Sequence, residues 1–268
     1  MMVSSRSIRL PLIISGFNLI LAAFALFAMI TNLSIARSDA HINYAMFLTI
    51  FKYVAFIEFV LMLFTMPALT AGSISGEREH RTLDLMLTTR LTPAKIVAGK
   101  MMTSVTTVIL MIVSSLPILA LIFAYGGVTI LDLVLLFIAY LIAAIFSASV
   151  GIWASSLSDR SAIATAATYA VMLLFVGGTI GFCYLIHNFM GNAGGWVYVL
   201  LINPAATFYA IISNITGTGA LAEFTQFFGA DLSHITSQQW FIAGSVLQLI
   251  LSAALIALAV KHTGPKSR

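Results

Sequence analysis

Six long apolar stretches divide this chain, and each is long enough to cross a lipid bilayer as a helix. An α-helix rises about 1.5 Å per residue, so about 20 apolar residues cover the roughly 30 Å of hydrocarbon. The stretches are Leu10–Ser34, Phe47–Ala71, Lys100–Ala124, Ile130–Ser156, Ala162–His187 and Gln239–Val260. Only 8% of the residues are charged, against about a quarter in soluble domains. We therefore predict an all-α polytopic membrane protein with six transmembrane helices in a single domain, residues 1–268.

A seventh apolar run, Trp196–Ile212, is shorter and is interrupted by Asn203-Pro204. An interrupted helix in lipid would leave backbone polar groups without hydrogen-bond partners. We therefore expect re-entrant or extracellular helices here, between the fifth and sixth spans. They belong to a long outer connector at about residues 187–238.

The distribution of lysine and arginine predicts the orientation of the spans. Eleven of the thirteen flank the spans on one side, with Arg37 and Lys52 opposite. The eleven are Arg6, Arg9, Arg78, Arg81, Arg90, Lys95, Lys100, Arg160, Lys261, Lys266 and Arg268. Basic residues accumulate on the cytosolic side of membrane proteins. Both termini are therefore predicted to be cytosolic, with the chain in the cytoplasmic (inner) membrane of a prokaryote.

Composition and motifs exclude several classes of function. The net charge of +4 comes from basic residues beside the spans, so we expect the lipid bilayer and no nucleic acid as a partner. The single cysteine, Cys183, lies in an apolar run and the histidines are dispersed, so no metal site is predicted. A GxxxxGK[ST] motif is missing, because Gly99-Lys100 is followed by Met101. We expect no cofactor on this chain and no enzymatic activity.

Small residues predict how the fourth and fifth spans pack. They recur every four residues at Ala143, Ser147, Gly151 and Ser155, and again at Ala162, Ala166 and Ala170. Only five residues separate the two spans. We therefore predict a tight hairpin in which these two small faces meet.

Glu58 lies near the middle of the second span, where a carboxylate is costly unless it is paired, hydrated or protonated. One interpretation is that Glu58 lines a translocation pathway together with Phe56 and Phe59. The other is a structural hydrogen bond to a neighbouring helix. The first keeps an alternative function open, an ion-driven secondary transporter that uses Glu58.

The connector between the second and third spans carries most of the charge inside the chain. A helical register from Glu77 places Leu83, Met86 and Leu87 on one face and charged residues on the other. Thr92-Pro93 is a helix start, with Thr92 as N-cap. A helix that lies on the membrane surface and a docking element for a soluble partner both agree with this pattern.

This connector resembles the permease subunits of the ABC type-2 transporter family. The resemblance rests on four segments: Gly72-Ser73-Ile74-Ser75-Gly76-Glu77-Arg78-Glu79, Thr82-Leu83-Asp84-Leu85-Met86-Leu87-Thr88, Leu91-Thr92-Pro93, and Ile96-Val97 with Gly99-Lys100. One departure is His80-Arg81, where the family more usually has a small or acidic residue followed by glycine.

The resemblance implies a permease subunit of an ABC exporter, with a coupling helix at about residues 75–92. Two separate ATPase subunits would bind ATP and Mg²⁺, and a second permease chain, identical or paralogous, would complete the transporter. The residues implied in ATPase coupling are Glu77, Arg78, Glu79, Arg81, Thr82, Leu83, Asp84 and Leu85.

Overall fold

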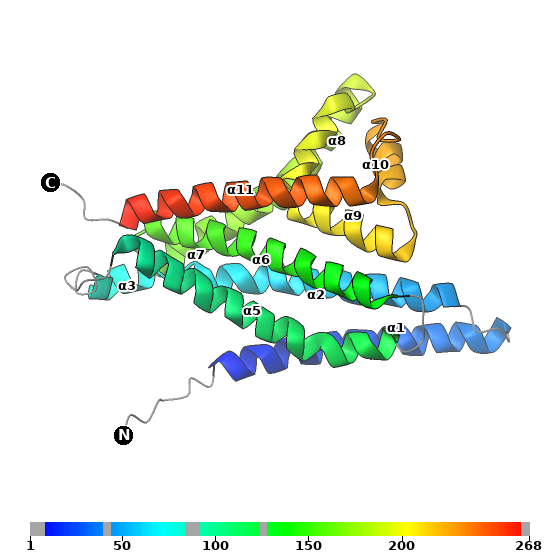
Figure 1. Ribbon diagram of the computed structural model, residues 1–268, viewed down its shortest axis with the longest axis horizontal. Coiled ribbons are helices and arrows are strands. Elements are labelled where there is room, and N and C mark those ends of the chain that lie inside the picture. The colour runs from blue at the N-terminus through cyan, green and yellow to red at the C-terminus, as the bar shows by residue number, and fades with distance from the viewer. Residues whose placement is uncertain (1–8, 40–43, 84–91, 124–127, 264–268) are drawn as a thin grey trace.

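The computed structural model describes residues 9–39, 44–83, 92–123 and 128–263, and all of its regular elements are helical. Within these ranges, six helical segments are long and apolar enough to cross a membrane, which confirms the predicted number of spans. They are α1 (Arg9–Asp39), α2 (Tyr44–Thr70), α5 (Pro93–Phe123), α6 (Ile130–Leu157), a fifth span over Ser161–Met190, and α11 (Ser237–Thr263). Figure 1 shows them as one elongated bundle.

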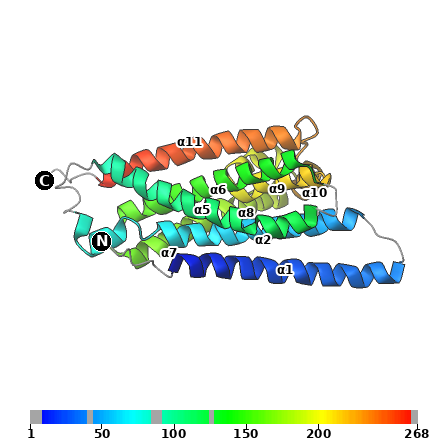
Figure 2. The ribbon, with the colours of Figure 1, turned by 60° about the horizontal axis from the view of Figure 1, so that its bottom comes forward.

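The central helix of this bundle is α6. It is more buried than any other span, and it packs against α2, α5, α7 and α11 (Figure 2). α5 begins at Pro93, seven residues before the predicted third span, because Thr92 caps it by accepting a hydrogen bond from the Lys95 amide (3.4 Å). The first turns of α5 therefore continue the span without a break.

The fifth span, Ser161–Met190, is continuous but contains a π-helical turn that no pattern in the sequence predicts. α7 (Ser161–Leu173) passes through a π-helical turn, η1 (Leu174–Gly178), into α8 (Thr179–Met190). A π-turn disturbs the regular helical hydrogen bonds, and Asn203 partners this region: its Nδ2 donates to the Val176 carbonyl (2.9 Å) and to Thr179 Oγ1 (2.9 Å). In Figure 1, α8 diverges from the axis of the bundle.

The seventh apolar run forms two helices at a sharp angle. η2 (Gly194–Leu201) and α9 (Pro204–Thr216) meet at 92°, which confirms the predicted interruption at Asn203-Pro204. Asn203 caps α9, because its Oδ1 accepts from the Ala205 amide (2.8 Å) and Pro204 follows at the first helical position. A further short helix, α10 (Ala220–Phe228), was not predicted.

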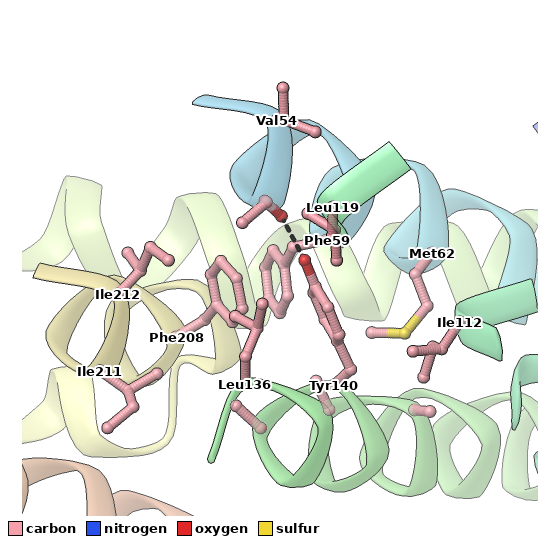
Figure 3. Close-up of a cluster of buried hydrophobic side chains, with 14 of the residues drawn as sticks. Val54, Phe59, Met62, Ile112, Leu119, Leu136, Tyr140, Phe208, Ile211 and Ile212 are labelled. Carbon is pink, nitrogen blue, oxygen red and sulfur yellow. Dashed lines mark hydrogen bonds between the residues drawn. The ribbon is translucent and has the colours of Figure 1, made fainter. Parts of the chain in front are cut away.

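α9 reaches into the core of the bundle. The ring of Phe208 stacks on Phe59 of α2 at 4.2 Å between centroids and lies 5.3 Å from Tyr140 of α6. Figure 3 shows the three rings in a row, with Ile211 and Ile212 at one end and Met62 and Ile112 at the other. The outer connector therefore packs against the spans rather than lying apart from them.

The predicted contact between the small faces of the fourth and fifth spans is wrong. Ala162, Ala166 and Ala170 are exposed, and α7 buries Ala164 and Thr168 instead. On α6 the small residues are buried, but Gly151 faces Thr70 at the end of α2. The four-residue period locates the small residues on each helix. It does not predict which neighbouring helix, if any, packs against them.

Candidate functional site: the α3 junction and a membrane groove

A five-residue helix, α3 (Ser75–Glu79), follows α2 at the end of the bundle where α1 begins and α11 ends (Figure 1). The turn before it is held by α6. Ser155 Oγ accepts hydrogen bonds from the backbone amides of Ile74 and Ser75, both at 2.9 Å. Both of these residues and Ser155 are buried, so the hydroxyl satisfies two donors that water cannot reach.

Glu77 connects α3 to the start of the third span. Its Oε1 accepts from Lys100 Nζ at 3.0 Å, and its Oε2 accepts a short hydrogen bond from the Thr82 hydroxyl. Leu83 is buried against Ile74 and Val97. The segment after α3 is thereby folded back onto α5.

Arg78 and Glu79 connect α3 to the turn between the fourth and fifth spans. Arg78 donates to the carbonyls of Ser156 (3.1 Å) and Ser158 (3.4 Å) and pairs with Asp159 (3.2 Å). Glu79 Oε2 accepts from both the amide (3.0 Å) and the hydroxyl (2.6 Å) of Ser161. The cation lies at the C-terminus of α6 and the carboxylate at the N-terminus of α7, which is the arrangement that helix dipoles favour.

Three consecutive charged residues therefore bind three different helices. The residues implied in ATPase coupling differ in their contacts within the chain. Four of them form hydrogen bonds or ion pairs with other residues of the chain: Glu77, Arg78, Glu79 and Thr82. Leu83 is buried and Arg81 is exposed. Asp84 and Leu85, like Met86 and Leu87, lie outside the described residues. The sequence pattern located this junction but did not indicate that Ser155 and Asp159, about eighty residues further along, are its partners.

Arg81 adopts a left-handed backbone conformation, with φ of +57°, and is the only non-glycine residue with a positive φ in the described part of the chain. It occupies the second position of His80-Arg81, where the resembling family more usually has glycine. A residue with a Cβ pays about 1–2 kcal/mol for this conformation.

We expect Arg81→Gly to stabilise the protein by about 1 kcal/mol, because glycine adopts positive φ without a steric cost. Thermal unfolding in detergent would measure the change. Arg81→Ala is the matched control, because it removes the guanidinium and keeps the Cβ, and it should not be stabilising. A glycine variant no more stable than the alanine variant would contradict this explanation.

Glu58 is buried in the bundle core. The residue is 1% exposed, and its carboxylate is hydrogen-bonded to two hydroxyls: by a short bond to Ser115 of α5, and by one to Tyr140 of α6 (3.1 Å). Each hydroxyl also lies 2.8 Å from a backbone carbonyl, that of Ile112 for Ser115 and that of Ala55 for Tyr140. Figure 3 draws the second of these bonds as a dashed line from Tyr140. This geometry matches the structural interpretation of Glu58, a polar link among α2, α5 and α6.

We expect Glu58→Gln to keep wild-type stability within about 1 kcal/mol and to keep transport. A carboxamide offers an acceptor oxygen and an NH₂ group with two N–H donors, and each hydroxyl can donate to the oxygen or accept from the NH₂ group. Glu58→Lys should lose several kcal/mol, because it buries an ammonium that has no carboxylate partner. Thermal unfolding and transport in vesicles would measure both variants. Abolished transport in a stable Glu58→Gln protein would instead favour an ion-coupling role.

An apolar groove of about 550 Å³ lies between α2 and the α7–η1 segment. Phe56 and Phe59, two residues predicted for a translocation pathway, line it together with Phe64 and Gly177. Glu58, between them in sequence, does not line it and is directed into the core. The three residues of the predicted pathway therefore separate into two places.

Comparison with known proteins identifies a family. A family model described as an ABC-2 family transporter protein matches residues 30–261. This range extends from the second half of α1 to the end of α11 and includes the α3 junction and the groove. The search of curated proteins gave no match.

Proposed function

Because this chain belongs to the ABC-2 transporter family, we propose that it is the permease subunit of an ABC exporter, driven by separate ATPase subunits that dock at the α3 junction. ATP and Mg²⁺ are bound by those partners and not by this chain. Two ATPase subunits and a second permease chain complete the transporter. It lies in the cytoplasmic membrane of a prokaryote with both termini in the cytosol, as the basic residues favour.

The α3 junction is the observation that carries this proposal. Hydrogen bonds and ion pairs join three residues of α3, Glu77, Arg78 and Glu79, to α5, to the end of α6 and to the start of α7. Ser155 of α6 holds the start of α3. A force applied to this junction reaches three spans at once. The exposed side chains of His80 and Arg81 and the segment that follows them, including Asp84 and Leu85, are the proposed ATPase contact.

In this mechanism, closure of the two ATPase subunits on ATP moves the α3 junction. The motion passes through Glu77 to α5 and through Arg78 and Glu79 to the turn between α6 and α7. Packed helices move as rigid elements between discrete arrangements, so the spans shift relative to α2. The permease pair then alternates between inward-facing and outward-facing states.

Recovery of the complex tests the proposal. Tagged permease is co-expressed with each ABC ATPase subunit of the same genome, and we expect one ATPase to co-purify. Arg81→Glu should reduce its recovery at least tenfold, because a charge reversal at the contact is repulsive or unpaired. Lys261→Glu, a reversal at the same end of the bundle on α11, is the matched control and should not. Transport by the purified permease alone would overturn the assignment.

A further inference from the structure

The two halves of the fifth span pack against different parts of the protein. The inner half, α7, packs on α6, where Met172 lies in one apolar cluster with Phe146 and Val150. The outer half, α8, packs on η2 and α10, and Cys183 of α8 lies in a second apolar cluster with Val197 of η2. We call α8, η2 and α10 the outer unit. A motion of the outer unit relative to α6 must be absorbed between α7 and α8.

η1 lies between these two halves and has little packing of its own. None of its five residues is buried, and a Cβ added at Gly177 would meet nothing within 4 Å. The hydrogen bonds of a π-turn run from residue i to i+5 in place of i+4, and helices bend sharply at such turns. In Figure 1, α8 leaves the axis of the bundle beyond η1. The fifth span can therefore change direction here without disturbing a packed core.

The side chain of Asn203 joins η1 to the bent pair, η2 and α9. Asn203 is fully buried at the corner of this pair. Its Nδ2 donates to the Val176 carbonyl and to Thr179 Oγ1, both at 2.9 Å. Its Oδ1 accepts from the amides of Ala205 (2.8 Å) and Ala206 (3.3 Å). An asparagine amide has two N–H donors and an oxygen with two lone pairs, so this one side chain both caps α9 and holds the π-turn.

α11 connects the bent pair to the α3 junction. Near its outer end, Gln248 Nε2 donates to Thr207 Oγ1 (2.8 Å) and to the Leu201 carbonyl (3.4 Å), on either side of the corner. Near its inner end, Ala259 packs with Ile74 at the start of α3. The helix between these contacts is uninterrupted, and its 27 residues extend about 40 Å. A displacement of the α3 junction therefore reaches the bent pair through a single rigid helix.

We propose that η1 is a hinge of the fifth span and that Asn203 is the positioning residue that sets its angle. α11 carries the motion of the α3 junction to the bent pair, Asn203 passes it to Val176 and Thr179, and α8 turns relative to α7. Rigid helices joined at a few residues that absorb the change are the usual design of a hinge motion. The proposal rests on the proposed function, because motion of the α3 junction on ATP binding is its input.

Distances between spin labels in the permease alone test the hinge. The labels are attached to cysteines introduced in a Cys183→Ala background, and labelled protein is diluted with unlabelled permease in nanodiscs. Leu131→Cys on α6 is paired with Phe189→Cys on α8 for the outer distance, and with Leu173→Cys on α7 for the inner distance. All three positions are exposed. α8 is about 18 Å long, so a bend of about 20° moves its tip by about 6 Å.

Asn203→Ser is the test variant, because serine can still cap α9 but has no amide to donate to η1. We expect it to shift or broaden the outer distance by about 6 Å and to leave the inner distance unchanged. Asn214→Ser, exposed on the same helix, is the matched control and should change neither distance. If Asn203→Ser does not fold, Thr179→Val removes one of the two bonds to the fifth span, keeps the cap of α9, and is expected to change the same distance. An unchanged outer distance in the folded variant, or an equal shift of both distances, would overturn the hinge.

Gly244→Ala tests whether α11 drives this hinge. A Cβ at Gly244 would lie 2.7 Å from Thr207 Oγ1 and 3.2 Å from the Leu201 carbonyl oxygen, so alanine pushes the bent pair away from α11. We expect the outer distance to shift, and to shift no further when Gly244→Ala is combined with Asn203→Ser. Ala243→Val, at the exposed neighbouring position, is the matched control and should have no effect. Wild-type distances in Gly244→Ala, or a full additional shift in the double variant, would contradict transmission through Asn203.

Transport measures what the hinge contributes to function. In vesicles that also contain the proposed ATPase partner, Asn203→Ser should lower transport per ATP hydrolysed at least tenfold, while recovery of the ATPase stays normal. Unchanged transport per ATP would overturn the role of Asn203 in transport. The distance measurements contain no ATPase, so the two proposals fail separately: unchanged distances with normal ATPase recovery would remove the hinge and leave the permease assignment standing.

Discussion

Replacing Gly151 with alanine should destabilise the protein by about 3 kcal/mol. A Cβ at this position would lie 1.9 Å from Thr70 Oγ1 and 2.8 Å from Thr70 Cβ. Rotation of the Thr70 side chain about χ1 can move its hydroxyl but cannot move its Cβ. To relieve the remaining clash, α2 and α6 would have to move apart at this contact. Overpacking of this kind costs about 1–3 kcal/mol, and the rigid contact places Gly151→Ala at the upper end. Thermal or denaturant unfolding in detergent would measure it.

Gly99→Ala is the matched control for this prediction. Nothing lies within 4 Å of a Cβ at Gly99, which is exposed within α5, so alanine should stabilise that helix by about 0.5–1 kcal/mol. Thr70→Gly combined with Gly151→Ala should recover most of the loss, because it removes the clashing Cβ. If Gly151→Ala were as stable as Gly99→Ala, the close approach of α2 and α6 would be contradicted.

The amino-acid sequence predicts the spans of this protein well because their signal is local. Apolar runs of sufficient length place all six, and Thr92-Pro93 and Asn203-Pro204 mark helix starts through their own backbone chemistry. The π-turn at η1 has no such signature. The Val176 carbonyl in this turn accepts a hydrogen bond from Asn203, which lies twenty-seven residues away. A sequence pattern within one helix cannot predict a hydrogen-bond partner outside that helix.

The same limit applies to the candidate site. The resemblance located Glu77, Arg78 and Glu79 but described them as ATPase contacts, while the structure gives each a partner on a different helix. Glu58 was recognised as unusual, yet its partners Ser115 and Tyr140 are ordinary residues of other spans. A single segment of sequence shows that a residue such as Glu58 is unusual for its position. The hydrogen-bond partners of that residue lie on other helices and are known only from the tertiary structure.

Removing the Ser155 hydroxyl should disconnect the α3 junction from the bundle. Ser155→Ala leaves the amides of Ile74 and Ser75 buried without their acceptor, and an unsatisfied buried donor costs about 1–3 kcal/mol. We expect a loss of about 3 kcal/mol in thermal or denaturant unfolding. In vesicles that also contain the ATPase proposed as its partner, transport per ATP hydrolysed should fall at least tenfold, because a loosened α3 passes less motion to α6.

Ser156→Ala separates this role from a general effect of losing a serine. Ser156 is also buried, but its hydroxyl donates to the Trp153 carbonyl of its own helix (2.7 Å). Removal of this hydroxyl therefore leaves no buried backbone amide without an acceptor, and Ser156→Ala should cost less than about 1 kcal/mol of stability. ATPase recovery should stay normal in both variants, since the exposed side chains of His80 and Arg81 are unchanged. If Ser155→Ala transports as efficiently as Ser156→Ala, the proposed coupling of ATP hydrolysis to the spans through the α3–α6 contact is wrong. A loss of transport with normal ATP hydrolysis would place the coupling step at these two hydrogen bonds.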